Sequence, residues 1–278
     1  PASTFKIPNT LIALETGVAT GPDFTLPWDS TAPREPGFWA SSWSRDHSLR
    51  SAMSNSVYWY YQELARRIGA ERMQRYLDRF DYGNRSLGGG IDRFWLHGDL
   101  RISPDRQVAF LRRMYFGELG VAERSTAILK DLLVLEETAG YRLSGKTGTA
   151  DVTPTRELAW LVGYVERDAR LWFFALNMEG EEVWERWGPP TERLELVRKI
   201  LRHLEVLPAS RRTPPAPGTA RGSTRGASSE ATGTRAEGIR MSEPTPPAVG
   251  TIGWVDLTVP DAESLQAFYA QVVGWAPQ

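Results

Sequence analysis

Ser3 and Lys6 stand three positions apart at the start of the sequence, in the run Ser-Thr-Phe-Lys. Apolar residues with helical spacing follow over residues 7–16, so this separation puts the hydroxyl and the amine on one helix face. A base can turn a serine into a nucleophile, and a lysine can be that base if burial lowers its pKa or if its nitrogen is modified. A helix N-terminus also offers free N–H groups to a developing oxyanion. A capping serine beside a solvated lysine is the alternative.

A second group of residues that could do chemistry is Lys146, Thr147 and Gly148. These residues stand at the end of a strand-like run, where they would put a cation and a hydroxyl on one face of an edge strand. The glycine would let a substrate lie against the backbone and take strand-like hydrogen bonds. A hairpin that carries a surface lysine is the alternative.

The composition excludes several other chemistries. The chain has no cysteine and only three histidines, His47, His97 and His203, which excludes thiol nucleophiles and makes a metal site improbable. We expect the histidines to be solvated. With 33 Lys and Arg against 34 Asp and Glu, no overall basic field attracts nucleic acid. No apolar run reaches the roughly 18 residues of a membrane-spanning helix, and the first residues lack a signal-peptide pattern.

Helical and strand-like patterns fall in separate blocks, which indicates an α+β fold. The helical lobe comprises the segments 57–68, 70–80, 104–116 and 122–135. Strand-like runs follow at 141–146, 158–165 and 171–178, and a last amphipathic helix is predicted at 191–204.

The composition changes after residue 207. Residues 208–250 are rich in Pro, Gly, Ser and Thr and nearly without aliphatic side chains, which predicts a disordered linker. Residues 251–260 read as a strand and residues 261–273 as a helix, too short a stretch for a core of its own. We therefore expect removal of this tail to change activity little.

Five sequence blocks occur in the order typical of one family. They are Ser-Thr-Phe-Lys-Ile-Pro-Asn from Ser3, Ser-Val-Tyr from Ser56 with Gln-Glu-Leu-Ala from Gln62, Tyr-Gly-Asn from Tyr82, Phe-Trp-Leu from Phe94 with Ile-Ser-Pro from Ile102, and Lys-Thr-Gly from Lys146. Over residues 1–207 the chain thus resembles a class D (oxacillinase-type) serine β-lactamase of the penicillin-binding, transpeptidase-like family. The resemblance implies a helical lobe and an antiparallel sheet flanked by helices, here without the first strands of the family fold.

The resemblance also implies the catalytic roles. Ser3 attacks the carbonyl of a β-lactam antibiotic, and Lys6, carbamylated by carbon dioxide, is the general base. Trp95 holds the carbamate, with plain core packing as the alternative for this side chain. Ser56 passes a proton toward the lactam nitrogen, and an N-cap role is its alternative. No metal and no cofactor besides carbon dioxide are expected.

The implied substrate contacts come from other positions. The backbone N–H groups of Ser3 and Thr149 form the oxyanion hole. The substrate carboxylate is bound by Lys146 and its neighbours Thr147 and Gly148, and by Arg193, for which a surface position is the alternative. Val57 and Tyr58 line the site, and the turn formed by Tyr82, Gly83 and Asn84 is structural.

Tyr58 departs from the family pattern, which usually has valine at this position. A larger ring would disturb the carbamate pocket and slow deacylation, so a penicillin sensor that is acylated without turnover stays open as a second function. A D,D-peptidase would normally show asparagine at position 58, and an inert fragment is a further alternative. The family implies a periplasmic or extracytoplasmic location. The tail resembles the first strand-helix unit of a vicinal-oxygen-chelate domain, to which we assign no activity.

Overall fold

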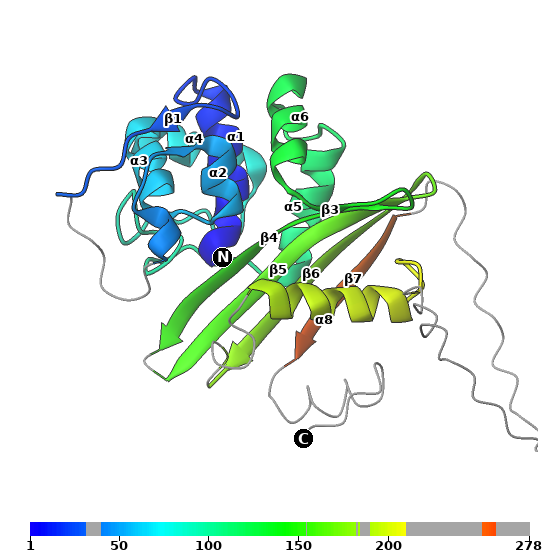
Figure 1. Ribbon diagram of the computed structural model, residues 1–278. Coiled ribbons are helices and arrows are strands. Elements are labelled where there is room, and N and C mark those ends of the chain that lie inside the picture. Colours follow the sequence, from blue (N-terminus) through cyan, green and yellow to red (C-terminus); the bar gives the residue numbers. More distant parts are fainter. Residues whose placement is uncertain (32–39, 154, 182, 184–189, 210–251, 260–278) are drawn as a thin grey trace, which may run out of the picture.

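The computed structural model describes residues 1–31, 40–153, 155–181, 183, 190–209 and 252–259. They form a helical lobe and a sheet that lie side by side (Figure 1). No helix in this part of the chain is long and apolar enough to cross a membrane.

The helical lobe is built around its first helix. A 3-10 turn, η1 (Ala2–Phe5), leads directly into α1 (Lys6–Glu15), in which every residue from Lys6 to Leu14 is buried. A helix that is buried all round belongs in the centre of a lobe. Around it lie α2 (Leu49–Ser54), α3 (Tyr58–Ile68), α4 (Ala70–Phe80), α5 (Pro104–Tyr115) and α6 (Glu123–Leu132), with a short pair formed by β1 (Thr25–Leu26) and β2 (His47–Ser48).

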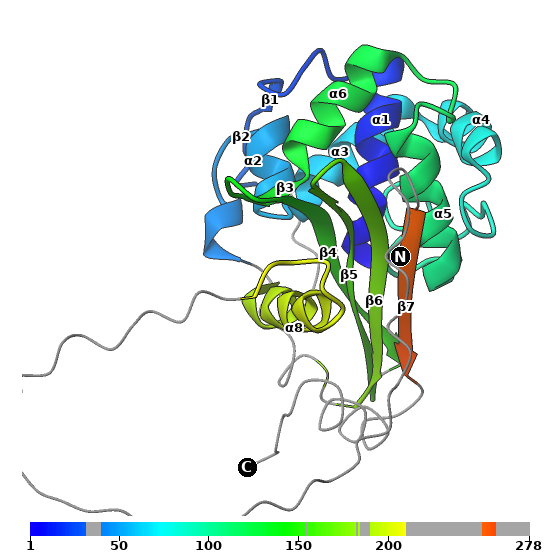
Figure 2. The same ribbon diagram turned by 90° about the vertical axis from the view of Figure 1, so that its right-hand side faces the viewer.

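The second lobe is a sheet in the order β3-β4-β5-β6-β7. Four consecutive strands are antiparallel, namely β3 (Val134–Glu137), β4 (Arg142–Thr153), β5 (Arg156–Arg167) and β6 (Arg170–Gly180). The strand β7 (Ile252–Val259) joins the sheet parallel to β6. The helix α8 (Pro190–His203) covers one face of the sheet, and α5 lies against the other (Figure 2).

Two apolar clusters hold the sheet between these layers. Phe173 and Ala175 of β6 face the core of the helical lobe. The alternate residues Phe174, Leu176 and Met178 face α8. Side chains of a strand alternate between its two faces, so β6 contributes to both cores.

The predicted helices and strands are largely confirmed, with three corrections, and a fourth correction concerns the exposure of a histidine. The helix expected over 122–135 ends at Leu132, because the chain from Val134 turns into β3 and pairs with β4. The strand expected over 141–146 continues to Thr153, so residues 146–148 lie inside β4 rather than at its end, because the ladder with β5 continues through them. The sheet is not wholly antiparallel, since β7 is parallel. His47 is buried, where its ring contacts Ser51 Oγ and Ser42 O.

The tail is described only in part. The strand expected at 251–260 is confirmed as β7. The predicted linker from residue 210 onward and the predicted helix 261–273 lie outside the described residues.

Candidate active site

Ser3 and Lys6 meet where η1 passes into α1. Lys6 Nζ donates a hydrogen bond of 2.7 Å to Ser3 Oγ, as the spacing of three predicts. Lys6 is only 1% exposed, which overturns the alternative of a solvated lysine. Burial lowers the pKa of Lys6 well below its usual 10.5, and the nearby charge of Lys146 lowers it further. The amine is therefore ready to accept a proton from the serine.

The strand β4 passes directly against this first turn at Gly148. A Cβ added to Gly148 would lie 3.0 Å from Pro1 O and 3.1 Å from the backbone nitrogens of Ser3 and Thr4. Only glycine lets two backbones come this close without displacing one of them. Because residue 148 has no side chain, the turn that carries Ser3 can lie this close to the sheet.

Lys146 and Arg193 add two more buried cations. Lys146 is 5% exposed and donates to Thr147 O at 3.1 Å and Thr147 Oγ1 at 3.3 Å. Arg193 of α8 is 2% exposed and donates through Nη1 to Gly148 O at 2.7 Å and Trp160 O at 3.1 Å. The alternatives of a surface lysine and a surface arginine are both wrong. Arg193 is instead tied to the backbone of the sheet beside Lys146.

Burial dominates the electrostatics of these cations. Burial, together with a smaller contribution from the charge of Arg193, lowers the pKa of Lys146 from 10.5 to about 7. The pKa of Arg193 falls to about 10 through burial alone. Such a site favours a bound anion, because the anion would offset charges that water does not screen.

Where β4 extends past the end of β3, its backbone offers hydrogen-bond donors. Gly145 N donates to Leu133 O at 2.8 Å, so Gly145 faces the β3 side of β4. Successive residues of a strand face opposite sides, and the β4–β5 register has no shift between Arg142 and Asp151. Thr147 and Thr149 therefore also direct their N–H groups to this side, past the end of β3. Within the described chain, the N–H of Ser3 has no acceptor.

Trp95 contacts the first turn at Ala2 and Phe5. Its carbonyl accepts a hydrogen bond of 3.0 Å from Ala2 N, and its ring stacks on Phe5 with the centroids 5.4 Å apart. The indole N–H is buried and has no partner in the described part of the chain. Tyr58, also buried, meets the Trp95 ring edge-on at 6.5 Å. Tyr58, which departs from the family pattern, therefore contacts Trp95, the residue expected to hold the carbamate.

Ser56 and Val57 lie in the short connection between α2 and α3. Val57 is buried and is the N-cap of α3, so the alternative of Ser56 as the N-cap is wrong. Ser56 is half-buried and has a φ of 54°, which is unusual for a residue with a side chain. Such strain occurs at functional sites, where the surroundings hold it. Among the described residues, its hydroxyl makes no hydrogen bond with Ser3 or Lys6.

A buried polar chain that the sequence did not predict supports the first turn. Gln107 Nε2 donates to Thr4 Oγ1 at 2.7 Å, and Tyr82 OH donates to Gln107 Oε1 at 3.4 Å. Thr4 in turn donates to Pro1 O at 2.7 Å. Thr4 and Tyr82 belong to quoted blocks and Gln107 does not, so the family pattern gave a partial signal. The turn formed by Tyr82, Gly83 and Asn84 was predicted to be structural. The contacts of Asn84 agree with this role, because its side chain donates to Asp99 O and accepts from Arg101 N.

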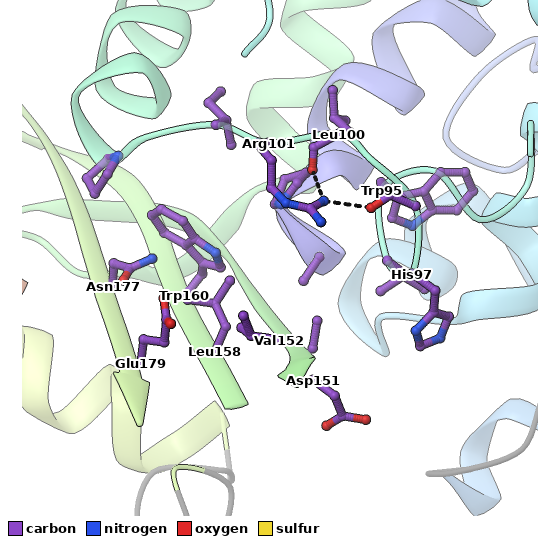
Figure 3. A pocket seen from close by; sticks show the side chains of 17 residues that line it. Trp95, His97, Leu100, Arg101, Asp151, Val152, Leu158, Trp160, Asn177 and Glu179 are labelled. Atoms are coloured by element: carbon purple, nitrogen blue, oxygen red, sulfur yellow. Dashed lines mark hydrogen bonds between the residues drawn. The ribbon is translucent and has the colours of Figure 1, made fainter. Parts of the chain in front are cut away.

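A cavity of about 440 Å³ adjoins the first turn (Figure 3). Trp95 and Leu100 line one side of it, and Leu158, Trp160 and Asn177 of the sheet line the other. Across the described residues, no three His, Cys, Asp or Glu side chains are grouped to hold a metal ion.

The comparisons with known proteins agree on one protein family. The penicillin-binding protein transpeptidase domain matches residues 1–202. β-Lactamase OXA-48 from Klebsiella pneumoniae is 45% identical over 180 residues, which cover 64% of this chain and 65% of that protein. The match thus spans less than two thirds of this relative's length.

Solved structures agree with this result. The class D β-lactamase YbXI from Nostoc aligns with a TM-score of 0.66 and 38% identity, covering 74% of this chain and 83% of that one. The C-terminal domain of the Bacillus licheniformis BlaR penicillin-receptor aligns with a TM-score of 0.67 and 36% identity, covering 75% and 80%. The fold predicted from the sequence blocks is therefore confirmed.

The contact at Gly148 can be tested by adding the missing methyl group. We expect Gly148→Ala to lower the free energy of unfolding by about 1–3 kcal/mol, because the β-carbon forces the first turn away from β4. Gly21→Ala is the matched control, since a Cβ there meets only Arg124 Nη2, at an ordinary 3.6 Å. Urea unfolding of both variants checks this, and equal midpoints would contradict the proposed close approach.

Proposed function

Because this chain belongs to the penicillin-binding protein transpeptidase family and, within it, to the class D β-lactamase group, we propose that it hydrolyses β-lactam antibiotics through an acyl-enzyme. The observation that carries the proposal is the 2.7 Å contact between Lys6 Nζ and Ser3 Oγ in a buried setting. It pairs a nucleophile with a base in a chain that has no cysteine. From the family resemblance, we also propose that the protein works outside the cytoplasm.

Acylation follows from this pair. The base at Lys6 takes the hydroxyl proton of Ser3 as Oγ bonds to the lactam carbonyl carbon. The N–H groups of Ser3 and Thr149 stabilise the oxyanion that forms. When the oxyanion collapses, the carbon–nitrogen bond of the lactam breaks, and Ser56 delivers a proton to the leaving nitrogen. Water then releases the product by attack on the Ser3 ester.

Substrate selection rests on charge. β-Lactam antibiotics carry a carboxylate, and the cations of Lys146 and Arg193 are buried in one site. The Thr147 hydroxyl and the close approach allowed by Gly148 add a short hydrogen-bonding edge. Val57 and Tyr58 supply an apolar wall. These features favour a small anionic acyl compound.

The residues around Lys6 fit a carbamate. Carbon dioxide adds to a neutral amine and a proton is released, so the lowered pKa of Lys6 favours the reaction. The buried indole N–H of Trp95, which has no partner in the described chain, is a suitable donor to the anion formed. A carbamate would supply a stronger, anionic base for deacylation. Lys6 and Trp95 would hold it.

The nucleophile assignment predicts a covalent adduct. Incubation with penicillin should add one drug mass to the protein, and Ser3→Ala should abolish this adduct and lower turnover by about a thousandfold or more. Intact-mass spectrometry measures the adduct, with Ser44→Ala as a control serine outside the site. Labelling of Ser3→Ala would assign the nucleophile elsewhere.

The carbamate predicts a dependence on bicarbonate and on pH. Added bicarbonate should raise turnover severalfold, and Lys6→Ala should trap or abolish the acyl-enzyme. As the pH falls through the lowered pKa of Lys6, a smaller fraction of the amine is neutral and the carbamate is incompletely formed. Added bicarbonate can restore carbamate through the neutral fraction that remains, so its effect should be larger on the acidic side than at high pH.

Turnover with and without bicarbonate, followed across pH, checks this expectation. Carbon-13 NMR with labelled bicarbonate should show one carbamate signal that is lost in Lys6→Ala. Lys199→Ala, an exposed lysine of α8, is the control and should keep both effects. Turnover that ignores bicarbonate at every pH would exclude the carbamate.

A second candidate function is a β-lactam receptor that is acylated without turnover. Two observations favour it. Tyr58 contacts Trp95, and the BlaR penicillin-receptor domain aligns as well as the enzymes do. Both functions share the acylation step, so only deacylation separates them.

Tyr58→Val distinguishes the two functions. If the ring disturbs the base, the substitution should speed deacylation about tenfold and leave acylation nearly unchanged. Tyr58→Phe is the matched control, because it keeps the ring and removes only the hydroxyl. Stopped-flow acylation and steady-state turnover with a chromogenic cephalosporin give both rates. Equal deacylation rates in all three proteins would weaken the receptor function.

A further inference from the structure

The connection between α2 and α3 holds Ser56 in an unusual backbone conformation. Ser56 has a φ of 54°, in the left-handed region that favours glycine. Its N–H donates to Met53 O at 3.2 Å, and the N–H of Val57 donates to Ala52 O at 2.9 Å. These two hydrogen bonds are those of a Schellman motif, which ends a helix and most often has glycine at the position of Ser56. A serine at this position is conformationally strained, whereas a glycine would not be.

The hydroxyl explains why a serine stands here. Glycine would relieve the backbone but has no side chain, and the proposed function requires a proton donor at this position. The strained conformation must therefore be held by its neighbours. The two hydrogen bonds of the motif restrain the N–H groups on either side of the Ser56 Cα atom. The carbonyl of Asn55, on the other edge of the first of these peptide groups, is bound from outside the helix.

Trp43 binds this carbonyl. It belongs to the 3-10 turn η2 (Ser41–Trp43), and its side chain is only 9% exposed. Its indole Nε1–H donates to Asn55 O at 2.9 Å. The peptide group between Asn55 and Ser56 is thus held at both polar atoms, by α2 at its N–H and by Trp43 at its C=O. It cannot rotate without breaking one of these bonds, so the direction of the Ser56 side chain is fixed.

Trp59 supports Trp43 in turn. Trp59 lies in the first turn of α3 and donates through Nε1 to Trp43 O at 2.9 Å. The same oxygen accepts a hydrogen bond of 2.9 Å from Arg45 N. The ring of Trp59 also packs on Trp28, with the centroids 5.3 Å apart. Two indole hydrogen bonds in series therefore link α3, η2 and the peptide group before Ser56.

We propose that Trp43 is a positioning residue for proton transfer by Ser56, and that Trp59 supports it. The inference rests on the proposed function. In that reaction Ser56 Oγ gives its proton to the lactam nitrogen as the carbon–nitrogen bond breaks, and it regains one from the base at Lys6, which took it from Ser3. Without the Trp43 hydrogen bond, one side of the peptide group is free, and the Ser56 hydroxyl is less often in line with the leaving nitrogen. Neither tryptophan belongs to the sequence blocks that carry the family resemblance.

The leaving group of the substrate separates a positioning role from a general loss of structure. The nitrogen of a penicillin needs a proton to leave, whereas the phenolate of an aryl ester departs without one. An acyclic aryl ester with a carboxyphenolate leaving group also keeps the carboxylate of the substrate. Trp43→Phe keeps an aromatic ring and removes the N–H. It should slow acylation by penicillin about tenfold and acylation by the ester less than about twofold, both followed by stopped flow.

Further variants test the path through Ser56. Ser56→Ala removes the hydroxyl, so Trp43→Phe should add no further loss of penicillin acylation in a Ser56→Ala background. Trp59→Phe should lower penicillin acylation about threefold, because it removes the support and leaves the bond to Asn55 in place. Trp172→Phe on β6, which packs in the apolar cluster that faces α8, is the matched control and should keep the original rates.

The strain at Ser56 has a signature that does not depend on the chemistry. Ser56→Gly should raise the Tm of the full chain by about 3 °C, because glycine adopts a positive φ without strain. Ser56→Ala keeps the β-carbon and should leave the Tm nearly unchanged. Equal Tm values for these two variants would mean that the backbone at Ser56 needs no support, which would overturn the proposal.

The kinetic outcomes are equally decisive. Equal slowing of penicillin and ester acylation by Trp43→Phe would overturn the positioning role, and additive losses in the double variant would mean that Trp43 acts without Ser56. If Trp43→Phe does not fold, Trp59→Phe provides the same comparison of the two substrates. Normal acylation of the unmodified protein that Trp43→Phe leaves unchanged would overturn this inference alone. An unmodified protein that penicillin does not acylate would overturn the proposed function together with it.

Discussion

The contact between β4 and the first helical turn is the constraint on which the site depends. The two backbones approach so closely at Gly148 that a β-carbon would lie 3.0–3.1 Å from backbone atoms of the turn, which would have to shift to admit it. Ser3 and Lys6 lie on one side of this contact, and Lys146 and Thr149 lie on the other. Chemistry that needs sub-ångström positions is thus built on rigid elements rather than on loops. The hydrogen bonds from Ala2 to Trp95 and from Gln107 to Thr4 fix the turn from two further directions.

Burial supplies the reactivity that the composition lacks. The chain has no cysteine, and the group that contacts the Ser3 hydroxyl is the amine of Lys6, a side chain that is normally protonated. Removing Lys6 from water and placing it near Lys146 favours the neutral amine. The cost of burying these cations is tolerable because the first turn and the sheet are held by extensive apolar packing.

Contacts between residues that are near in the sequence could be predicted from local geometry. Contacts between distant segments could be predicted only from the order of the family's sequence blocks. The Ser3–Lys6 contact was predictable because a separation of three within a helix is a local geometry. The meeting of Ser3 with Gly148 follows from no local rule, and only the order of the sequence blocks indicated it. The short helix α2 and the strand β3 were missed, because each is too brief to show a period. Gln107 was missed because its hydrogen bonds to Thr4 and Tyr82 join three distant segments.

One of the buried cations, Lys146, also couples ligand binding to the proton content of the protein. The pKa of Lys146 lies near 7, so at neutral pH this amine is charged in only part of the molecules. An anion held beside Lys146 raises its proton affinity, and each bound anion therefore brings a fraction of a proton with it from the solvent. The heat measured on binding then contains the ionisation enthalpy of the buffer. Arg193 keeps its charge throughout and sets the part of the attraction that does not depend on pH.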